Sequence, residues 1–155
     1  MDNRSMLDAL ERMLDGSKVA VLATVGEDGC PTVRWMTPAV VRGRDGYLYA
    51  VTSPSFAKAR HVKANMNVTW MLQTKSLNEI LNICGEMSII DNPAAKAEVL
   101  EALGGNLGTF WKVNPDESSL VVLETRITSA TLFHPLSGEK DDFTSGHNDS
   151  GENDG

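Results

Sequence analysis

The chain has 155 residues, of which 41% are hydrophobic and 23% are charged, an ordinary composition for one globular domain with a real core. It contains no run of about eighteen apolar residues, which excludes an ordinary membrane-spanning helix. The net charge of −7 is unevenly spread, since six acidic residues and one lysine from Gly138 onward contribute −5 of it. The body is therefore nearly neutral, which argues against a nucleic-acid binder.

Hydrophobic periodicity and turn residues predict the elements of the first part of the chain. Apolar residues recur at helical spacing between a capping box at Ser5–Asp8 and a stop at Gly16. Apolar runs between turns then predict three strands, and a hydroxyl-rich turn predicts a helix after them; these segments are 18–25, 31–41, 47–52 and 55–64. We expect the second and third strands to form a hairpin, with Pro38 at a bend or an edge.

The second part of the chain continues with strands and one clear helix. Gly85 marks a bulge or bend in a long strand, and Asn92-Pro93 has the residue types that begin a helix. The predicted segments are a strand at 68–72, the long strand at 77–91, a helix from 93 to about 103, and final strands at 120–127 and 130–134. Without a regular alternation of strands and helices, these elements favour a mainly β (α+β) fold, an antiparallel barrel with peripheral helices.

The two ends of the chain and its cysteines give further predictions about domain limits, metal binding and location. Residues 137–155 are rich in Gly, Asp, Ser and Asn, so we expect a disordered acidic tail after one domain of residues 1–136. Cys30 and Cys84 lie far apart, and no Cys/His cluster has the spacing of metal ligands, so no metal site is predicted. Reduced cysteines and an N-terminus unlike a secretion signal favour a cytoplasmic location.

The strongest functional signal is LYAVTSPSFAKARHVKAN, residues 48–65. A strand leads into a turn with three hydroxyls, from Thr52, Ser53 and Ser55, and then into a helix with Lys58 in its first turn. A helix start presents unpaired N–H groups and the positive end of its dipole. Together with hydroxyls and an ammonium group, these suit a phosphate. Taken alone, the same pattern also describes a capped helix after a strand.

Basic residues concentrate around this segment. Six of them lie between Arg34 and Lys63, where Asp45 is the single opposing charge, which favours a small anionic ligand. Arg34 stands in a strand that is otherwise apolar on one face, and a bidentate, permanently charged guanidinium there suits a phosphate. An exposed arginine on the solvent face is the alternative. We expect Arg42, Arg44 and Lys63 to be solvated turn and helix charges.

A longer series of residues carries a family resemblance. The pattern is G-x-P-x-V-R, then a strand ending in Thr, then a Lys six residues later that opens a helix ending near Asn; its residues are Gly29, Pro31, Val33, Arg34, Thr52, Lys58 and Asn65. On this series, and on the order of elements over most of the chain, the sequence resembles the FMN-binding split-barrel family. That family includes the pyridoxamine 5'-phosphate oxidases and the smaller flavin binders of the general-stress-protein type.

The resemblance implies a split β-barrel that forms a homodimer, with two equivalent FMN sites along the subunit interface. The residues that it implies for the flavin phosphate are Arg34, Thr52, Ser53, Ser55 and Lys58. It implies that the backbone of Trp35, Met36 and Thr37 flanks the flavin ring, and that Trp111 approaches the flavin of the partner subunit. Core packing of Trp35 and Met36, and a loop-anchoring role for Trp111, are the alternatives.

Several positions depart from the family pattern. Phe56 replaces the serine usually found two residues before the lysine, Ala39 stands where the full oxidases have a lysine, and Glu79-Ile80 stands where they have an Arg-Gln pair. These departures argue against oxidation of pyridoxamine phosphate itself. They leave a small FMN-dependent oxidoreductase as the expected function, with its catalytic residues unassigned.

Other functions stay open from the sequence. One alternative is a non-catalytic flavin-binding stress protein, and another is a binder of deazaflavin or haem on the same fold. A haem would need an axial histidine, for which His61 and His134 are the candidates.

Overall fold

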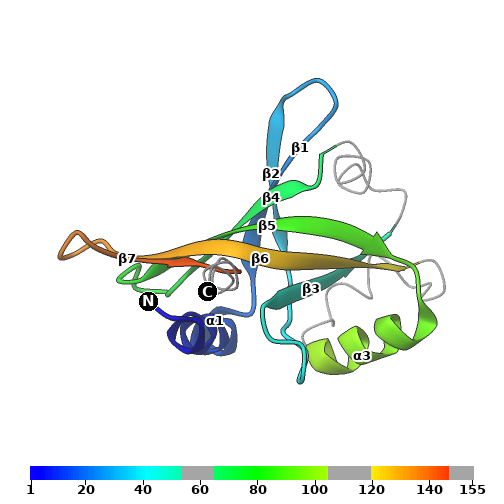
Figure 1. Cartoon of the computed structure of the whole chain (residues 1–155), viewed down its shortest axis with the longest axis horizontal. Helices are drawn as coiled ribbons and strands as arrows, with labels where there is room; N and C mark the ends of the chain where they lie inside the picture. Colours follow the sequence, from blue (N-terminus) through cyan, green and yellow to red (C-terminus); the bar gives the residue numbers. More distant parts are fainter. Residues whose placement is uncertain (54–64, 105–119, 147–155) are drawn as a thin grey trace, which may run out of the picture.

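The computed structural model describes residues 1–53, 65–104 and 120–146 of the chain (Figure 1). Within these residues, seven strands form one antiparallel sheet against which two helices pack. In chain order they are α1 (Asn3–Ser17), β1 (Ala20–Val25), β2 (Pro31–Met36), β3 (Tyr47–Thr52), β4 (Asn67–Gln73), β5 (Ile80–Ile90), α3 (Pro93–Leu103), β6 (Val121–His134) and β7 (Glu139–Thr144).

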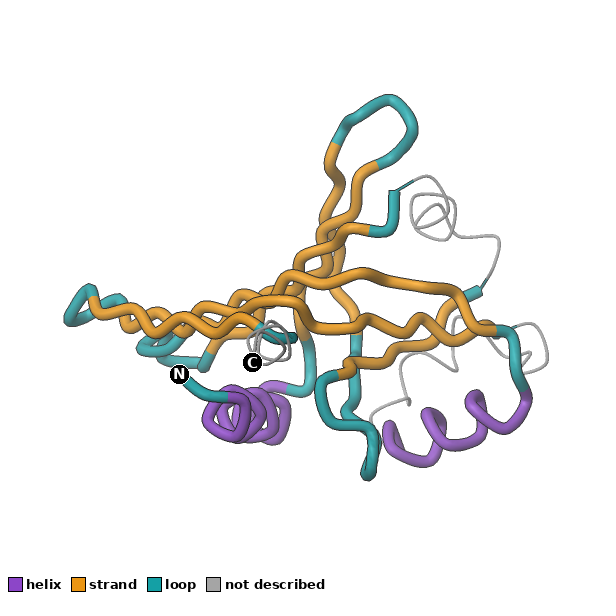
Figure 2. The backbone as a smooth tube through the Cα atoms, viewed as in Figure 1, coloured by secondary structure: helices purple, strands orange, loops and turns teal. Residues whose placement is uncertain are grey.

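Strand β6 organises the sheet because it has three neighbours. It pairs with β5 along almost its whole length, while its other edge pairs first with β3 and then with β7. The strand order is β2-β1-β4-β5-β6-β3, with β7 added on β6. In the described part of the chain, β2 and β3 do not pair, so the sheet curls without closing (Figure 2). This confirms the predicted mainly β fold with a split barrel.

The long pair of β5 and β6 bends at a bulge, as the sequence predicts for Gly85. The register shifts between Cys84 and Gly85, where Cys84 opposes Ser129 and Gly85 opposes Ile127. A Cβ atom on residue 85 would lie 2.5 Å from the carbonyl oxygen of Arg126, so glycine permits this close approach of the two backbones.

The main core fills the concave side of the sheet, beneath α1. Leu22, Trp70 and Ile83 from adjacent strands are fully buried there, and α1 contributes Met6 and Leu10. We call the sheet side that carries Leu22, Trp70 and Ile83 the inner face. A smaller cluster lies between α3 and the other side of β3 and β6; it comprises Ala39, Val41, Tyr49, Val51, Val99, Leu103 and Val122.

Local chemistry sets the helix ends. Asp2, not Ser5, caps α1, because its carboxylate accepts a hydrogen bond from the backbone N–H of Ser5 at 2.8 Å. The predicted capping box is therefore displaced by three residues. The helix ends at Ser17, next to Lys18 with φ of 65°. For α3 the prediction is confirmed, since Asn92 caps the helix and Pro93 is its first residue.

Three predictions about the strands are wrong. The segments 31–41 and 47–52 do not form a hairpin, because Pro38 follows the end of β2 and only an isolated bridge, Ala39 to Tyr49, links the two segments. The two predicted final strands are one continuous strand, β6. The predicted disordered tail contains β7, which pairs with β6 and buries Phe143 in the main core.

Candidate functional site

Arg34 lies in β2, where it opposes Leu22 of β1. The side chains of directly opposed residues share a face, so Arg34 projects on the inner face, beside the core. The side chain is half-buried, and burial lowers the pKa of its guanidinium. Its Nη2 donates a hydrogen bond to Oγ1 of Thr32. Its Nη1 is buried and has no hydrogen-bond partner among the described residues.

Thr52 is the last residue of β3, and its side chain is fully buried. Because side chains alternate along a strand, Thr52 shares a face with Leu48 and Ala50, which both belong to the main core. Its hydroxyl oxygen, like Nη1 of Arg34, is buried without a hydrogen-bond partner among the described residues. Thr52 and Arg34 thus project toward the same core from strands far apart in the sheet order.

Unpartnered polar atoms of this kind are costly. Burying a donor or an acceptor without a hydrogen bond costs about 1–3 kcal/mol, and more for a charged group. Three such side-chain atoms occur among the described residues, in Arg34, Thr52 and His134. Two of the three belong to residues that the sequence assigns to a phosphate site. A buried guanidinium N–H and a buried hydroxyl on the core side of the sheet are both groups that donate to an anionic oxygen.

The other predicted site residues divide into three groups. Met36 is buried in the main core, so its packing role is confirmed, and Thr37 and Ser53 are half-buried at strand ends. Trp35 is 68% exposed, so it does not pack in the core. The remaining residues, Ser55, Lys58 and Trp111, lie outside the described part of the chain, as does the predicted helix at 55–64.

The exposed Trp35 belongs to an apolar area on the convex side of the sheet, which we call the outer face. Trp35 opposes Val21 of β1, which in turn opposes Met71 of β4. Val33 lies two residues before Trp35 and is also 68% exposed. Exposed large apolar side chains grouped on one sheet face are typical of a surface that another molecule covers.

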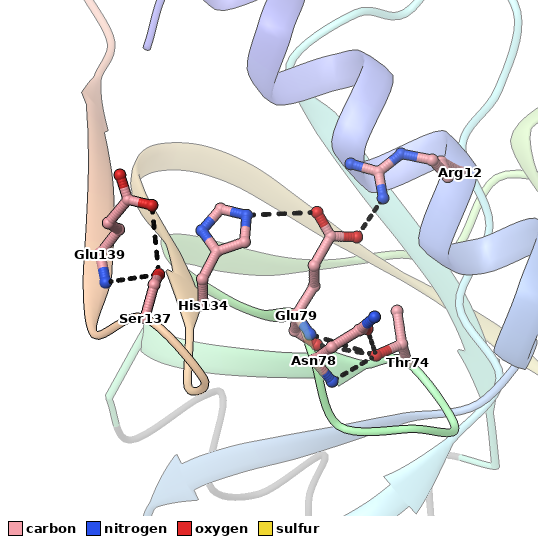
Figure 3. Close-up of polar contacts among 7 residues, drawn as sticks. All are labelled: Arg12, Thr74, Asn78, Glu79, His134, Ser137 and Glu139. Carbon is pink, nitrogen blue, oxygen red and sulfur yellow. Dashed lines mark hydrogen bonds and ion pairs between the residues drawn. The ribbon is translucent and has the colours of Figure 1, made fainter.

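A second polar cluster, which the sequence does not reveal, joins three distant elements (Figure 3). Glu79 precedes β5, and its carboxylate pairs with Arg12 of α1 on one side. On the other side, Nε2 of His134, at the end of β6, lies 3.4 Å from Glu79 Oε2. Only the fold brings these residues together, so no local pattern marks them.

This second cluster offers little to a cofactor. The side chain of Glu79 contacts two cationic or potentially cationic partners, and its backbone N–H donates to Oγ1 of Thr74. Among the described residues, Nδ1 of His134 is buried without a partner, but these residues contain no group of three potential metal ligands. The described helices also include none long and apolar enough to cross a membrane.

Comparison with known proteins identifies the family. The family model described as pyridoxamine 5'-phosphate oxidase matches residues 6–134, which span both Arg34 and Thr52. The chain therefore belongs to the pyridoxamine 5'-phosphate oxidase-like family. No curated protein sequence matches it significantly.

Solved structures share the fold at low sequence identity. A protein from Clostridium acetobutylicum related to general stress protein 26 superposes with a TM-score of 0.71 at 17% identity, covering 94% of this chain and 97% of the other. An FMN-binding protein from Nostoc punctiforme gives 0.67 at 15% identity, covering 90% and 96%. A haem-binding protein from Mycobacterium smegmatis gives 0.66 at 18% identity, covering 85% and 55%. At these identities the likeness establishes the fold, which accommodates different cofactors.

Proposed function

We propose that the protein binds FMN and that Arg34 and Thr52 hold the flavin phosphate. The observation that supports this proposal is the pair of buried polar atoms, Nη1 of Arg34 and Oγ1 of Thr52, that have no partner in the part of the chain that the structure describes. A phosphate would accept a charge-assisted hydrogen bond from the first and a neutral one from the second. Ser53, Ser55 and Lys58 follow Thr52 directly in the sequence and would complete the phosphate site.

The flavin ring would lie along the backbone of Trp35, Met36 and Thr37, next to Arg34. A bound flavin supplies hydride and electron transfer itself, so the protein needs to provide position, shape and electrostatics. Trp111 of each subunit would approach the flavin ring that its partner binds.

A homodimer would use the outer face. Val33 and Trp35 are each 68% exposed there, and β1 and β4 extend the same apolar area with Val21 and Met71. A two-fold dimer buries the same patch of both subunits, which accounts for one exposed apolar area per chain. Because Arg34 alternates with Val33 and Trp35 along β2, a dimer through this face would lie next to both cofactor sites.

We propose further that the protein is a small flavin-dependent oxidoreductase acting in the cytoplasm. A non-catalytic flavin carrier is the second candidate, because residues typical of the full oxidases are missing. Ala39 and Glu79 stand at positions where the full oxidases have such residues. Ala39 is 7% exposed and belongs to the smaller core cluster, and the carboxylate of Glu79 pairs with Arg12 and His134. Neither residue offers a polar group to a substrate phosphate.

Other cofactors are weaker candidates on the described residues. Haem would need an axial histidine, but Nε2 of His134 faces the carboxylate of Glu79 and its Nδ1 is buried. His61 lies outside the described residues. Deazaflavin carries a phosphate as FMN does, so the phosphate site alone does not separate the two.

The visible absorption spectrum of the purified protein tests the proposal. The protein is mixed with FMN, freed of the excess and compared with the untreated sample. We expect a retained flavin spectrum at about one flavin per subunit, followed by reduction when a nicotinamide cofactor is added. A protein that stays colourless would contradict FMN binding, and a single intense band in the violet would assign haem instead.

A further inference from the structure

The segment of residues 40–47, which leads into β3, passes near α1 (Figure 1). A groove lies between this segment and α1. Arg4, Leu7 and Glu11 line it from α1, and the whole segment of residues 40–47 lines it from the other side. Its volume of about 390 Å³ falls within the range of small-molecule sites.

The groove has an apolar floor. Leu7 and Val41 are 4% and 8% exposed, and Val40 and Tyr47 are half-buried. The ring of Tyr47 stacks on that of Tyr49, with ring centroids 6.3 Å apart. Tyr49 is itself buried, so the ring of Tyr47 rests on a fixed support beside the groove.

Three guanidinium groups surround this floor, from Arg4, Arg42 and Arg44. Arg4 pairs with Asp8 and Glu11 at 3.1 and 3.2 Å, and Arg44 pairs with Glu98 at 3.0 Å. Among the described residues, Arg42 has no ion pair. Arg42 therefore offers the whole hydrogen-bonding fork of its guanidinium to a ligand.

Acidic residues in the groove limit what it accepts. Glu11 and Asp45 also line it, so its charged lining sums to +1, from three arginines and two carboxylates. A polyphosphate would meet both carboxylates with several negative charges of its own. A ligand with a single negative charge and an apolar body fits better, because the body covers the floor while its charge meets Arg42.

The groove is separate from the proposed phosphate site at Thr52. Tyr47 and Thr52 are the two ends of β3, and at about 3.3 Å per residue they are roughly 17 Å apart. A ligand over Tyr47 is therefore too distant to share a phosphate contact with Thr52.

From these observations we propose that the groove is a second ligand site, which binds a small organic anion with a flat apolar body, such as an aromatic carboxylate. The ring of the ligand stacks over Tyr47 between Leu7 and Val40. Its carboxylate accepts two parallel hydrogen bonds from Arg42. This site does not depend on FMN binding, so either proposal can fail without the other.

Methyl NMR of the full-length chain, titrated with 2-naphthoate, tests the second site. We expect the methyl signals of Leu7, Val40 and Val41 to shift in a saturable way, while those of Val21 and Val33 on the outer face stay in place. The neutral analogue 2-naphthalenemethanol should bind more weakly. Replacing Arg42→Ala should weaken naphthoate binding about tenfold, as expected for loss of a charge-assisted contact.

A matched control is Lys75→Ala, because Lys75 is an exposed cation in the turn between β4 and β5; we expect unchanged affinity for this variant. The proposal is wrong if Arg42→Ala binds naphthoate as tightly as the unmodified chain, or if only the signals of the outer face shift. It is also wrong if the groove signals move with protein concentration alone, because a second copy of the chain then covers the groove.

Discussion

Two polar regions of this protein contrast in how their charged groups are paired. Around Glu79, the carboxylate has partners on both sides, Arg12 and His134, and three distant elements are held together, although Nδ1 of His134 is itself buried without a hydrogen-bond partner among the described residues. Around Arg34 and Thr52, buried polar atoms face the core without partners among the described residues. The first arrangement stabilises the fold, whereas the second is costly unless a ligand completes it. The contrast is between a carboxylate that the fold itself pairs and buried polar atoms that the proposed flavin phosphate would pair.

The largest expected effect comes from Arg34→Met. Methionine keeps most of the length and removes the charge, so FMN binding should weaken by about 2 kcal/mol, roughly thirtyfold. The FMN-free protein should be no less stable, because a partly desolvated charge has been removed. Isothermal titration and urea denaturation measure the two quantities.

The control for this variant is Arg126→Met. Arg126 is also a strand arginine, but it pairs with Glu86 on the surface. Its replacement should leave FMN affinity unchanged. If both variants bind FMN alike, Arg34 is not a phosphate ligand.

Thr52→Val should also weaken FMN binding without destabilising the FMN-free protein, but by a smaller amount. Valine has nearly the same shape but no hydroxyl, so it removes the unpartnered oxygen from the core. FMN affinity should fall by about 1 kcal/mol, roughly fivefold, while the free energy of unfolding without FMN rises slightly. A fall in that free energy would show that the hydroxyl already has a partner in the protein.

Glu79→Gln should have the opposite effect, because it should lower the stability of the fold and leave FMN binding alone. Losing the charge between Arg12 and His134 should lower the free energy of unfolding by about 1 kcal/mol, with FMN affinity unchanged. The matched control is Glu86→Gln, which affects a more exposed pair and should cost about 0.3 kcal/mol. Equal losses in both variants would remove the distinction between the Glu79 cluster and an ordinary surface pair.

The last prediction is a pH dependence that arises from Tyr49, whose hydroxyl donates to Oε2 of Glu124 at 2.7 Å. Burial and this hydrogen bond raise the pKa of Tyr49 from 10.0 to about 12. Between these values the unfolded chain binds fewer protons than the folded chain, so the free energy of unfolding should fall as pH rises. Urea denaturation of the unmodified chain and of Tyr49→Phe checks this, since the variant lacks this component. An identical alkaline slope in both would rule out Tyr49 as its source.

The sequence is most informative about residues that stand in a local pattern. Arg34 and Thr52 were assigned from the residue types around them, and the structure places both side chains on the core side of the sheet. The register between them was predicted wrongly, because each strand pairs with a partner distant in sequence. Pro38 contributes to this difference, since β2 ends before it and only the single bridge between Ala39 and Tyr49 links the two segments.

Other features had no local signal. Arg12 and Glu79 are 67 positions apart, so only the folded sheet reveals their contact. Strand β7 resembles a disordered tail because Glu139, Asp141 and Asp142 dominate it, yet charges are what an exposed edge strand tolerates. Phe143 is its single buried residue, and one apolar residue among charges is too weak a pattern to predict a strand.

The position of β7 has a practical consequence for shortening the chain. A chain cut after Ser137, where the composition turns acidic, would lose Phe143 from the core and expose the edge of β6 from Ser129 to His134. A bare hydrogen-bonding edge of this length invites pairing with other chains and hence aggregation. A chain that ends after Gly146 keeps the strand. A truncated chain should therefore end there, and not at the residue where the composition turns acidic.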